Sequence, residues 1–146
     1  MMIRATAALA AVALGATIVY AQNFNAIKIR QDAMKSMGDA AKEPGAMMKG
    51  NAPFDLGKVQ ASLKTIEDVA SKGKSLFPDD SKTGETDALP VAFERKADVF
   101  ARFDKLDVDA KAAAAATKDE ATFKAEWPKV VGNCGGCHKE YRKPKQ

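Results

Sequence analysis

The chain is poor in histidine, cysteine and tryptophan, and these shortages limit the chemistry that it can support. Its 146 residues include one histidine, two cysteines and one tryptophan. Two thiols and one imidazole are one ligand short of a structural zinc site, which needs four. The formal net charge of +4 is too small to favour binding to nucleic acid, and acidic and basic residues are interspersed. No strand-length alternation of apolar and polar residues occurs, so the sequence does not predict a β-sheet.

A long apolar run occurs only at the N-terminus. Residues 1–21 begin with a single charge at Arg4, continue through an apolar stretch and end in small residues at Ala21. This pattern predicts a signal peptide that is removed on export to the periplasm, with an uncleaved anchor as the alternative. No later stretch approaches the roughly 18 apolar residues of a membrane span, so we expect no stable membrane anchor after processing. Residues 22–146 are long enough for one folded domain.

Apolar residues recur at helical spacing in four blocks, which predicts four amphipathic helices. The blocks cover residues 24–49, 54–72, 91–117 and 119–142. Helices of this kind must bury their apolar faces against one another, and a bundle does so with short connections. The sequence therefore predicts an all-α four-helix bundle, although periodicity alone does not determine the order of the helices.

Prolines and glycines mark the breaks in this pattern. Pro44 and Pro128 fall inside the first and fourth blocks, where each is expected to kink or end the helix. Gly73 follows the second block and suits a helix C-cap. Residues 74–90 form a connection that is long for a compact domain, and we expect Leu76 and Phe77 to attach it to the core.

The cysteines and the histidine lie together near the C-terminus. Cys134, Cys137 and His138 form the sequence Cys-x-x-Cys-His, which is typical of covalent c-type haem attachment. Residues three apart share a helix face, so both thiols can form thioethers with the two vinyl groups of one haem. The imidazole that follows is then placed to bind the iron as the proximal ligand. We therefore predict one covalent haem c; the alternatives are a thioredoxin-type dithiol, a local disulfide and a metal site.

The other side of the iron has fewer candidate ligands. The chain has no second histidine and no further cysteine, which leaves a methionine, a less usual donor such as lysine, or an open position. Outside the predicted leader the methionines are Met34, Met37, Met47 and Met48. Met34 lies on the apolar face of the first block and is the candidate second ligand, with Met37 the weaker candidate. The alternative for Met34 is ordinary core packing.

Arg30 lies on the same helix face as Met34, four residues earlier. A guanidinium that faces a core is costly unless an anion pairs with it. Haem propionates supply carboxylates, which arginine can bind through two parallel hydrogen bonds. We therefore expect Arg30 to bind a propionate, with a solvated side chain as the alternative.

The haem motif and its surroundings resemble those of the class II c-type cytochromes, which comprise cytochrome c′ and the cytochrome c-556 group. The resemblance rests on residues 131–142 around the haem motif and 30–35 near the mature N-terminus, with shorter matches at 48–50 and 76–78. It extends over about residues 23–143. A C-terminal haem motif is specific, because most other c-type cytochromes carry theirs near the N-terminus.

The resemblance implies a fold and the roles of several residues. The fold is an antiparallel four-helix bundle, of which cytochrome c′ is a known example. The implied roles are thioether attachment at Cys134 and Cys137, axial ligation by His138, and a place near the haem edge for Arg30 and Gln31. At the position of Met34 the family divides: a methionine ligates the iron in c-556-like members, whereas in cytochromes c′ the side chain only covers an open site. Phe93 departs from the cytochrome c′ pattern, which often has a tryptophan there.

These observations predict a small periplasmic electron carrier rather than an enzyme, with low-spin iron bound by histidine and methionine. The alternatives are a five-coordinate, high-spin cytochrome c′ that binds NO or CO, and a thiol–disulfide protein without haem. Docking to acidic surfaces of redox partner proteins is expected through basic residues: Lys139, Arg142, Lys143 and Lys145, with Lys124 and Lys129 upstream. Class II relatives form both monomers and homodimers, so both states are expected alternatives.

Overall fold

The computed structural model describes residues 25–145, so the predicted signal peptide lies outside the described part of the chain. The chain is helical from residue 25 to residue 40, a segment called the N-terminal helix below. The helices that follow are α2 (Lys42–Met48), α3 (Leu56–Ala70), α4 (Val91–Glu94), α5 (Lys96–Ala116) and α6 (Glu120–Tyr141). Two short 3-10 helices, η1 (Gly73–Leu76) and η2 (Asp79–Ser81), lie in the connection after α3.

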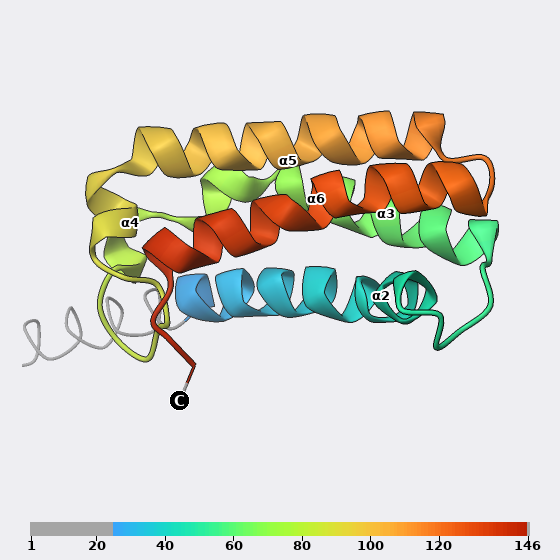
Figure 1. The fold of residues 1–146 in the computed structure, drawn as a ribbon. Coiled ribbons are helices and arrows are strands. Elements are labelled where there is room, and N and C mark those ends of the chain that lie inside the picture. The colour runs from blue at the N-terminus through green and yellow to red at the C-terminus, as the bar shows by residue number, and fades with distance from the viewer. Residues whose placement is uncertain (1–24, 146) are drawn as a thin grey trace, which may run out of the picture.

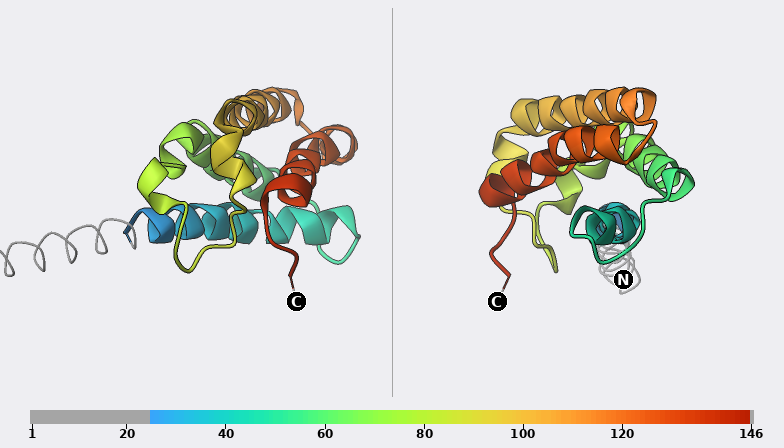
Figure 2. Two further views of the ribbon diagram at one scale, coloured as in Figure 1. Left: turned by 90° about the vertical axis from the view of Figure 1, so that its left-hand side faces the viewer. Right: turned by 45° about the vertical axis from the view of Figure 1, so that its right-hand side comes forward.

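The long helices lie side by side and alternate in direction along the chain. In Figure 1 the N-terminal helix and α2 run one way, α3 runs back, α5 runs forward and α6 returns. Figure 2 shows the same helices from two other sides. α5 packs against both α3 and α6, and α2 contacts α3. The predicted four-helix bundle is confirmed, and its order is up-down-up-down. Within residues 25–145, every helix is too short or too polar to cross a membrane.

Pro44 interrupts the first helical block without ending it. Proline has no backbone N–H, so the carbonyl of Ala40 loses its partner in the helix. The hydroxyl of Ser62, which belongs to α3, donates to that carbonyl at 2.7 Å. The helix resumes as α2 after a turn at Ala41. A contact from the neighbouring helix therefore compensates for the break and fixes where the two helices meet.

Side chains cap the beginnings of α3 and α6. The carboxylate of Asp55 accepts a backbone N–H from the first turn of α3 at 3.0 Å. At α6, Asp119 accepts the backbone N–H of Thr122 at 2.8 Å, and the Thr122 hydroxyl accepts the Asp119 N–H at 3.0 Å. This reciprocal arrangement is a capping box, which satisfies donors that a helix N-terminus leaves unpaired. Pro128 lies inside α6 and does not end it.

The core lies between the facing sides of α3, α5 and α6. These helices contribute a set of buried apolar side chains: Val59, Leu63, Ile66, Val99, Phe103, Leu106, Phe123, Trp127 and Val130. Leu76 and Phe77 are also buried, so the prediction that they attach the long connection to the core is confirmed. Gly73 contacts Phe103 so closely that a Cβ atom at this position would overlap the ring.

Candidate haem site

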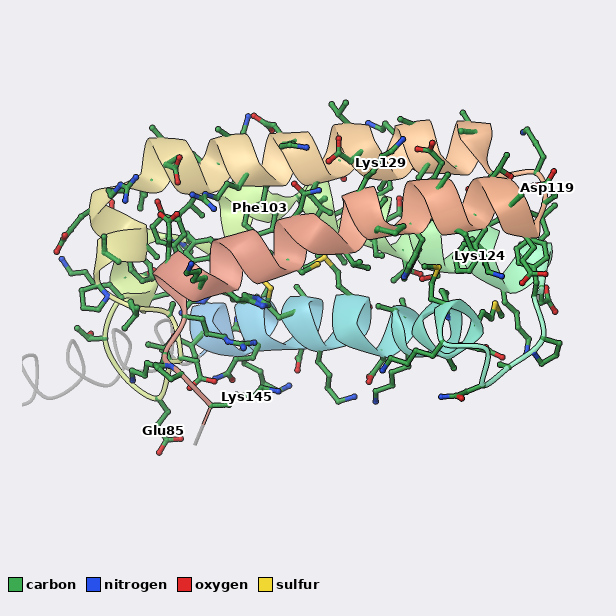
Figure 3. All side chains as sticks on the ribbon, in the orientation of Figure 1. Glu85, Phe103, Asp119, Lys124, Lys129 and Lys145 are labelled. Carbon is green, nitrogen blue, oxygen red and sulfur yellow. The ribbon has the colours of Figure 1, made fainter. Side chains whose placement is uncertain are left out.

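The last helix carries the haem motif at the boundary between the core and the surface. Cys134, Cys137 and His138 are half-buried, and the buried Val130 and Tyr141 flank them on the same stripe of α6. The Cys137 side chain packs against the core. Both thiols are free, so no disulfide joins them. In Figure 3, sulfur atoms lie between the ribbons of α6 and the N-terminal helix.

Burial dominates the ionisation of all three side chains in the motif. It raises the pKa of both the Cys134 and the Cys137 thiol, although the positive charge of Arg102 acts in the opposite direction on the pKa of Cys137. Burial also lowers the pKa of His138. The imidazole is therefore held neutral at pH 7, and a neutral imidazole nitrogen is the form that binds iron.

The surroundings of His138 are positively charged. Besides burial, the groups that lower the pKa of His138 are the cations Arg142 and Lys145. The Nε atom of Arg142 is buried and has no hydrogen-bond partner within residues 25–145. A buried donor without an acceptor is costly, so this atom points to a missing acceptor. Haem c fits these residues, because it would bring two vinyl groups for the thiols, iron for the imidazole and two propionates for the cations.

Met34 is the half-buried methionine of the N-terminal helix, and it packs against the hydrophobic core. Met37 and Met47 are buried, with 8% and 4% of their surfaces exposed. Met48 is half-buried in α2 and also contacts the core. Met34 therefore lies at the margin of the core, whereas Met37 fills its interior. Iron ligation by Met34 stays a prediction.

Arg30 is buried, and its terminal nitrogens hold the connection that follows α3. Nη1 donates to the carbonyl of Leu76 at 3.0 Å and to the hydroxyl of Ser81 at 2.7 Å. Nη2 donates to the carbonyl of Ser81 at 3.0 Å and to the hydroxyl of Thr86 at 2.8 Å. The expectation that this guanidinium requires an anion is therefore corrected, because neutral oxygen atoms satisfy both terminal nitrogens. Propionate binding by Arg30 stays a prediction, with Nε as the nitrogen left for it.

The same part of the N-terminal helix makes further contacts with this connection and with Phe93 of α4. The Arg30 guanidinium carbon lies 5.1 Å from the ring centroid of Phe77 and 5.4 Å from that of Phe93. The exposed side chain of Gln31 donates to the carbonyl of Glu85 at 3.0 Å. Burial lowers the pKa of Arg30, and the aromatic faces offset part of that cost through cation–π attraction. A place for Gln31 at the haem edge stays a prediction.

The chain after α6 pairs with the same connection. Ala88 and Arg142 form an antiparallel bridge, and the N–H of Leu89 donates to the carbonyl of Tyr141 at 2.9 Å. The Lys143 side chain donates to the carbonyl of Thr86 at 2.7 Å. The residues that follow the haem motif are thus held by the loop that Arg30 also holds.

The predicted basic residues divide into two groups. Lys124 pairs with Glu120 at 2.6 Å and Lys129 with Glu126 at 2.7 Å, so neither adds an uncompensated charge. In the part of the chain that the structure describes, the other four have no acidic partner within 4.0 Å; we call Lys139, Arg142, Lys143 and Lys145 the C-terminal basic cluster. Figure 3 shows Lys124 and Lys129 on α6 and Lys145 near the C-terminal end.

Polar contacts beside the haem motif join α5 to α6, and sequence reasoning missed them. The hydroxyl of Tyr141 donates to Asp98 at 2.5 Å, and Nε of Arg102 donates to the same oxygen at 2.7 Å. The four-residue spacing of Asp98 and Arg102 on one helix could have indicated that pair. No local pattern links either residue to Tyr141, which lies about forty positions away on another helix.

The bundle and the C-terminal motif together define a class of protein: a c-type cytochrome whose haem is attached to the last helix of a four-helix bundle. Comparison with known families agrees, because the family model described as Cytochrome C′ matches residues 25–142. The chain belongs to the cytochrome c′ family. It is an electron-carrying haem protein with one covalently bound haem c, and it is not an enzyme.

The most similar relatives include both branches of the resemblance. A cytochrome c′ of Rhodopseudomonas palustris is 45% identical over 135 residues, which cover 92% of each chain. A cytochrome c-556 of Agrobacterium fabrum is 35% identical over 138 residues, covering 94% of this chain and 92% of its own. The solved structure of Rhodopseudomonas palustris cytochrome c′ aligns with a TM-score of 0.80 at 46% identity, over 83% of this chain and 98% of that one.

Proposed function

We propose that the protein is a periplasmic electron carrier whose low-spin haem iron is bound by His138 and Met34. Met34 packs against the hydrophobic core, and Cys137 of the haem motif packs against the same core. This shared position is the observation that carries the proposal. The chain offers no second histidine to compete for the iron. Several relatives of 30% to 37% identity are named cytochrome c-556, which supports the same ligand set.

A bound haem would supply the one-electron chemistry, and the residues of the chain hold it. Cys134 and Cys137 would hold the porphyrin through thioethers, and His138 would offer a neutral nitrogen to the iron. Met34 approaches from a different helix, so the ligand pair depends on the packing of the bundle. Ligation by histidine and methionine raises the reduction potential, which suits a carrier that must accept electrons readily.

A second candidate is a five-coordinate, high-spin protein that binds NO or CO. It is favoured by the relative of 45% identity, which is named cytochrome c′. In that case Met34 covers the open side of the iron without binding it. The two candidates share the haem attachment and differ at one coordination position.

Optical spectra of the purified protein, oxidised and reduced, distinguish the two. The proposal expects a low-spin spectrum that becomes high-spin in Met34→Ala, together with new binding of CO. Met48→Ala is the matched control, because Met48 is also half-buried and packed against the core. A high-spin wild-type spectrum that Met34→Ala leaves unchanged would support the second candidate. A mass equal to that of the bare processed chain would overturn both.

The C-terminal basic cluster supports docking to an acidic partner surface. Within residues 25–145 its four cations have no acidic partner, and they lie in the seven residues that follow the haem motif. Charged residues at the edge of a docking surface mainly increase the rate at which two proteins associate. We propose that redox partners approach this end of α6; a monomer and a homodimer stay as alternatives.

A further inference from the structure

A charged cluster joins α5 to the last turn of α6 beside the haem motif. Arg102 donates from Nε to Asp98 at 2.7 Å and from Nη2 to Glu140 at 2.9 Å. Arg95 lies 3.5 Å from the other oxygen of Glu140, and the hydroxyl of Tyr141 donates to Asp98. We call these five residues the Arg102 cluster.

The cluster lies against the turn of α6 that carries the haem ligands. Tyr141 is 4% exposed, and the guanidinium carbons of Arg102 and Arg95 lie 5.2 Å and 5.7 Å from its ring centroid. Arg102 reaches the haem motif at Gly136. A Cβ atom there would lie 3.9 Å from Nη1 of Arg102. The positive charge of Arg102 also reaches the Cys137 sulfur, where it opposes the effect of burial on the pKa.

The charges of the cluster balance one another. Two guanidinium groups face two carboxylates, so the group carries no net charge. Hydrogen bonds from Tyr141 and Arg102 lower the pKa of Asp98, and the hydrogen bond to Asp98 raises the pKa of Arg102. Both therefore stay ionised at pH 7. Replacing one charged side chain by its neutral analogue leaves a single uncompensated charge next to the haem motif.

We infer that the Arg102 cluster positions the haem-binding turn of α6 and sets the reduction potential of the haem attached there. This inference rests on the proposed attachment of haem to Cys134, Cys137 and His138. Ferric haem carries one more positive charge than ferrous haem. A neighbouring cation therefore favours the ferrous state, and a neighbouring anion favours the ferric state. The interaction between these charges and the haem iron is stronger where protein rather than water separates them.

The test compares two variants that remove charges of opposite sign from the same contact. Arg102→Gln leaves a carboxylate uncompensated, so we expect a more negative potential in an equilibrium redox titration. Asp98→Asn leaves a guanidinium uncompensated, so we expect a more positive potential. In each variant the ferrous-to-ferric ratio at the wild-type midpoint should change at least five-fold, which corresponds to about 40 mV for a one-electron couple.

Opposite shifts separate an electrostatic role from a purely structural one. Loss of packing alone would move both variants in the same direction, because both would loosen the same turn. Arg102→Lys keeps the charge and should restore most of the potential. Lys111→Gln is the matched control, since it removes a cation of α5 that lies nine residues, or about 13 Å, further along the helix.

The possible outcomes test this inference and the proposed function separately. Shifts in the same direction, or shifts no larger than that of the Lys111 control, would overturn the inference while the haem assignment stands. A wild-type protein without covalent haem would instead overturn the proposed function. Where the Arg102 and Asp98 variants fail to fold, Arg95→Gln and Glu140→Gln repeat the comparison, because both of these side chains are exposed.

Discussion

Replacement of Arg30 by methionine tests whether this buried arginine holds the connection after α3. Methionine keeps much of the apolar stem but removes four hydrogen bonds, given by two nitrogens to Leu76, Ser81 and Thr86. Each hydrogen bond to a charged group contributes about 1.5–3 kcal/mol, but the simple sum overstates the loss because burying the guanidinium is itself costly. Removing the guanidinium leaves buried neutral acceptors without a partner, and each such group costs about 1–3 kcal/mol, so we expect the free energy of unfolding to decrease by at least this amount.

Urea unfolding of the haem-loaded protein measures this decrease, and amide hydrogen exchange locates it. Protection should fall in residues 76–89, whereas the optical spectrum should keep its form because no proposed iron ligand changes. Lys28→Met is the control, since Lys28 is an exposed cation of the same helix and is paired with Asp32 at 2.6 Å. A loss below about 1 kcal/mol with unchanged protection of the connection would refute the structural role of Arg30.

Three further changes test other features. Gly73→Ala places a methyl group in the Phe103 ring and should lower the free energy of unfolding by about 1–3 kcal/mol, which thermal unfolding would reveal; an unchanged midpoint would contradict the close contact. Asp119→Ala removes the cap of α6 and should lower the urea midpoint. The backbone hydrogen bond from Thr122 lowers the pKa of Asp119. The contribution of Asp119 to stability is therefore present above its unfolded pKa of about 3.9 and is lost as the pH falls through the folded pKa. An equal effect of Asp119→Ala on both sides of this pH range would contradict the predicted role of the cap. Lys139→Glu should slow association with an acidic redox partner and weaken its dependence on ionic strength in stopped-flow measurements, whereas unchanged rates would exclude this docking surface.

The haem motif and the bundle could be predicted because their signals are local in the sequence. Two thiols and an imidazole within five residues need no tertiary contact to be recognised, and helical periodicity marks a buried face wherever the chain folds. The effect of Pro128 was harder to predict, because a proline can either end a helix or be tolerated within it.

The partners of Arg30 could not be predicted, because they are neutral oxygens in a connection without periodicity. Gly73 shows the same limit, since its place in the sequence suits a helix C-cap, whereas the C-cap of α3 is Ser71. In the structure, positive φ angles occur at Gly50 and Gly84 within residues 25–145, and Gly73 is required instead by the Phe103 ring, thirty residues away. The sequence places Lys124 and Lys129 in the predicted basic surface, although glutamates on the same helix pair with both.

The bridge between Ala88 and Arg142 joins the tail after α6 to the connection that precedes α4. The tail after the haem motif is hydrogen-bonded to residues 86–89, and Arg30 of the N-terminal helix donates to Thr86 in the same segment. Fraying of the tail would therefore disturb the environment of a buried cation on the N-terminal helix, so the tail and residues 86–89 should open together rather than one by one. In an electron carrier, these hydrogen bonds would keep the haem-binding part of α6 rigid. The atoms around the haem would then move little when its oxidation state changes.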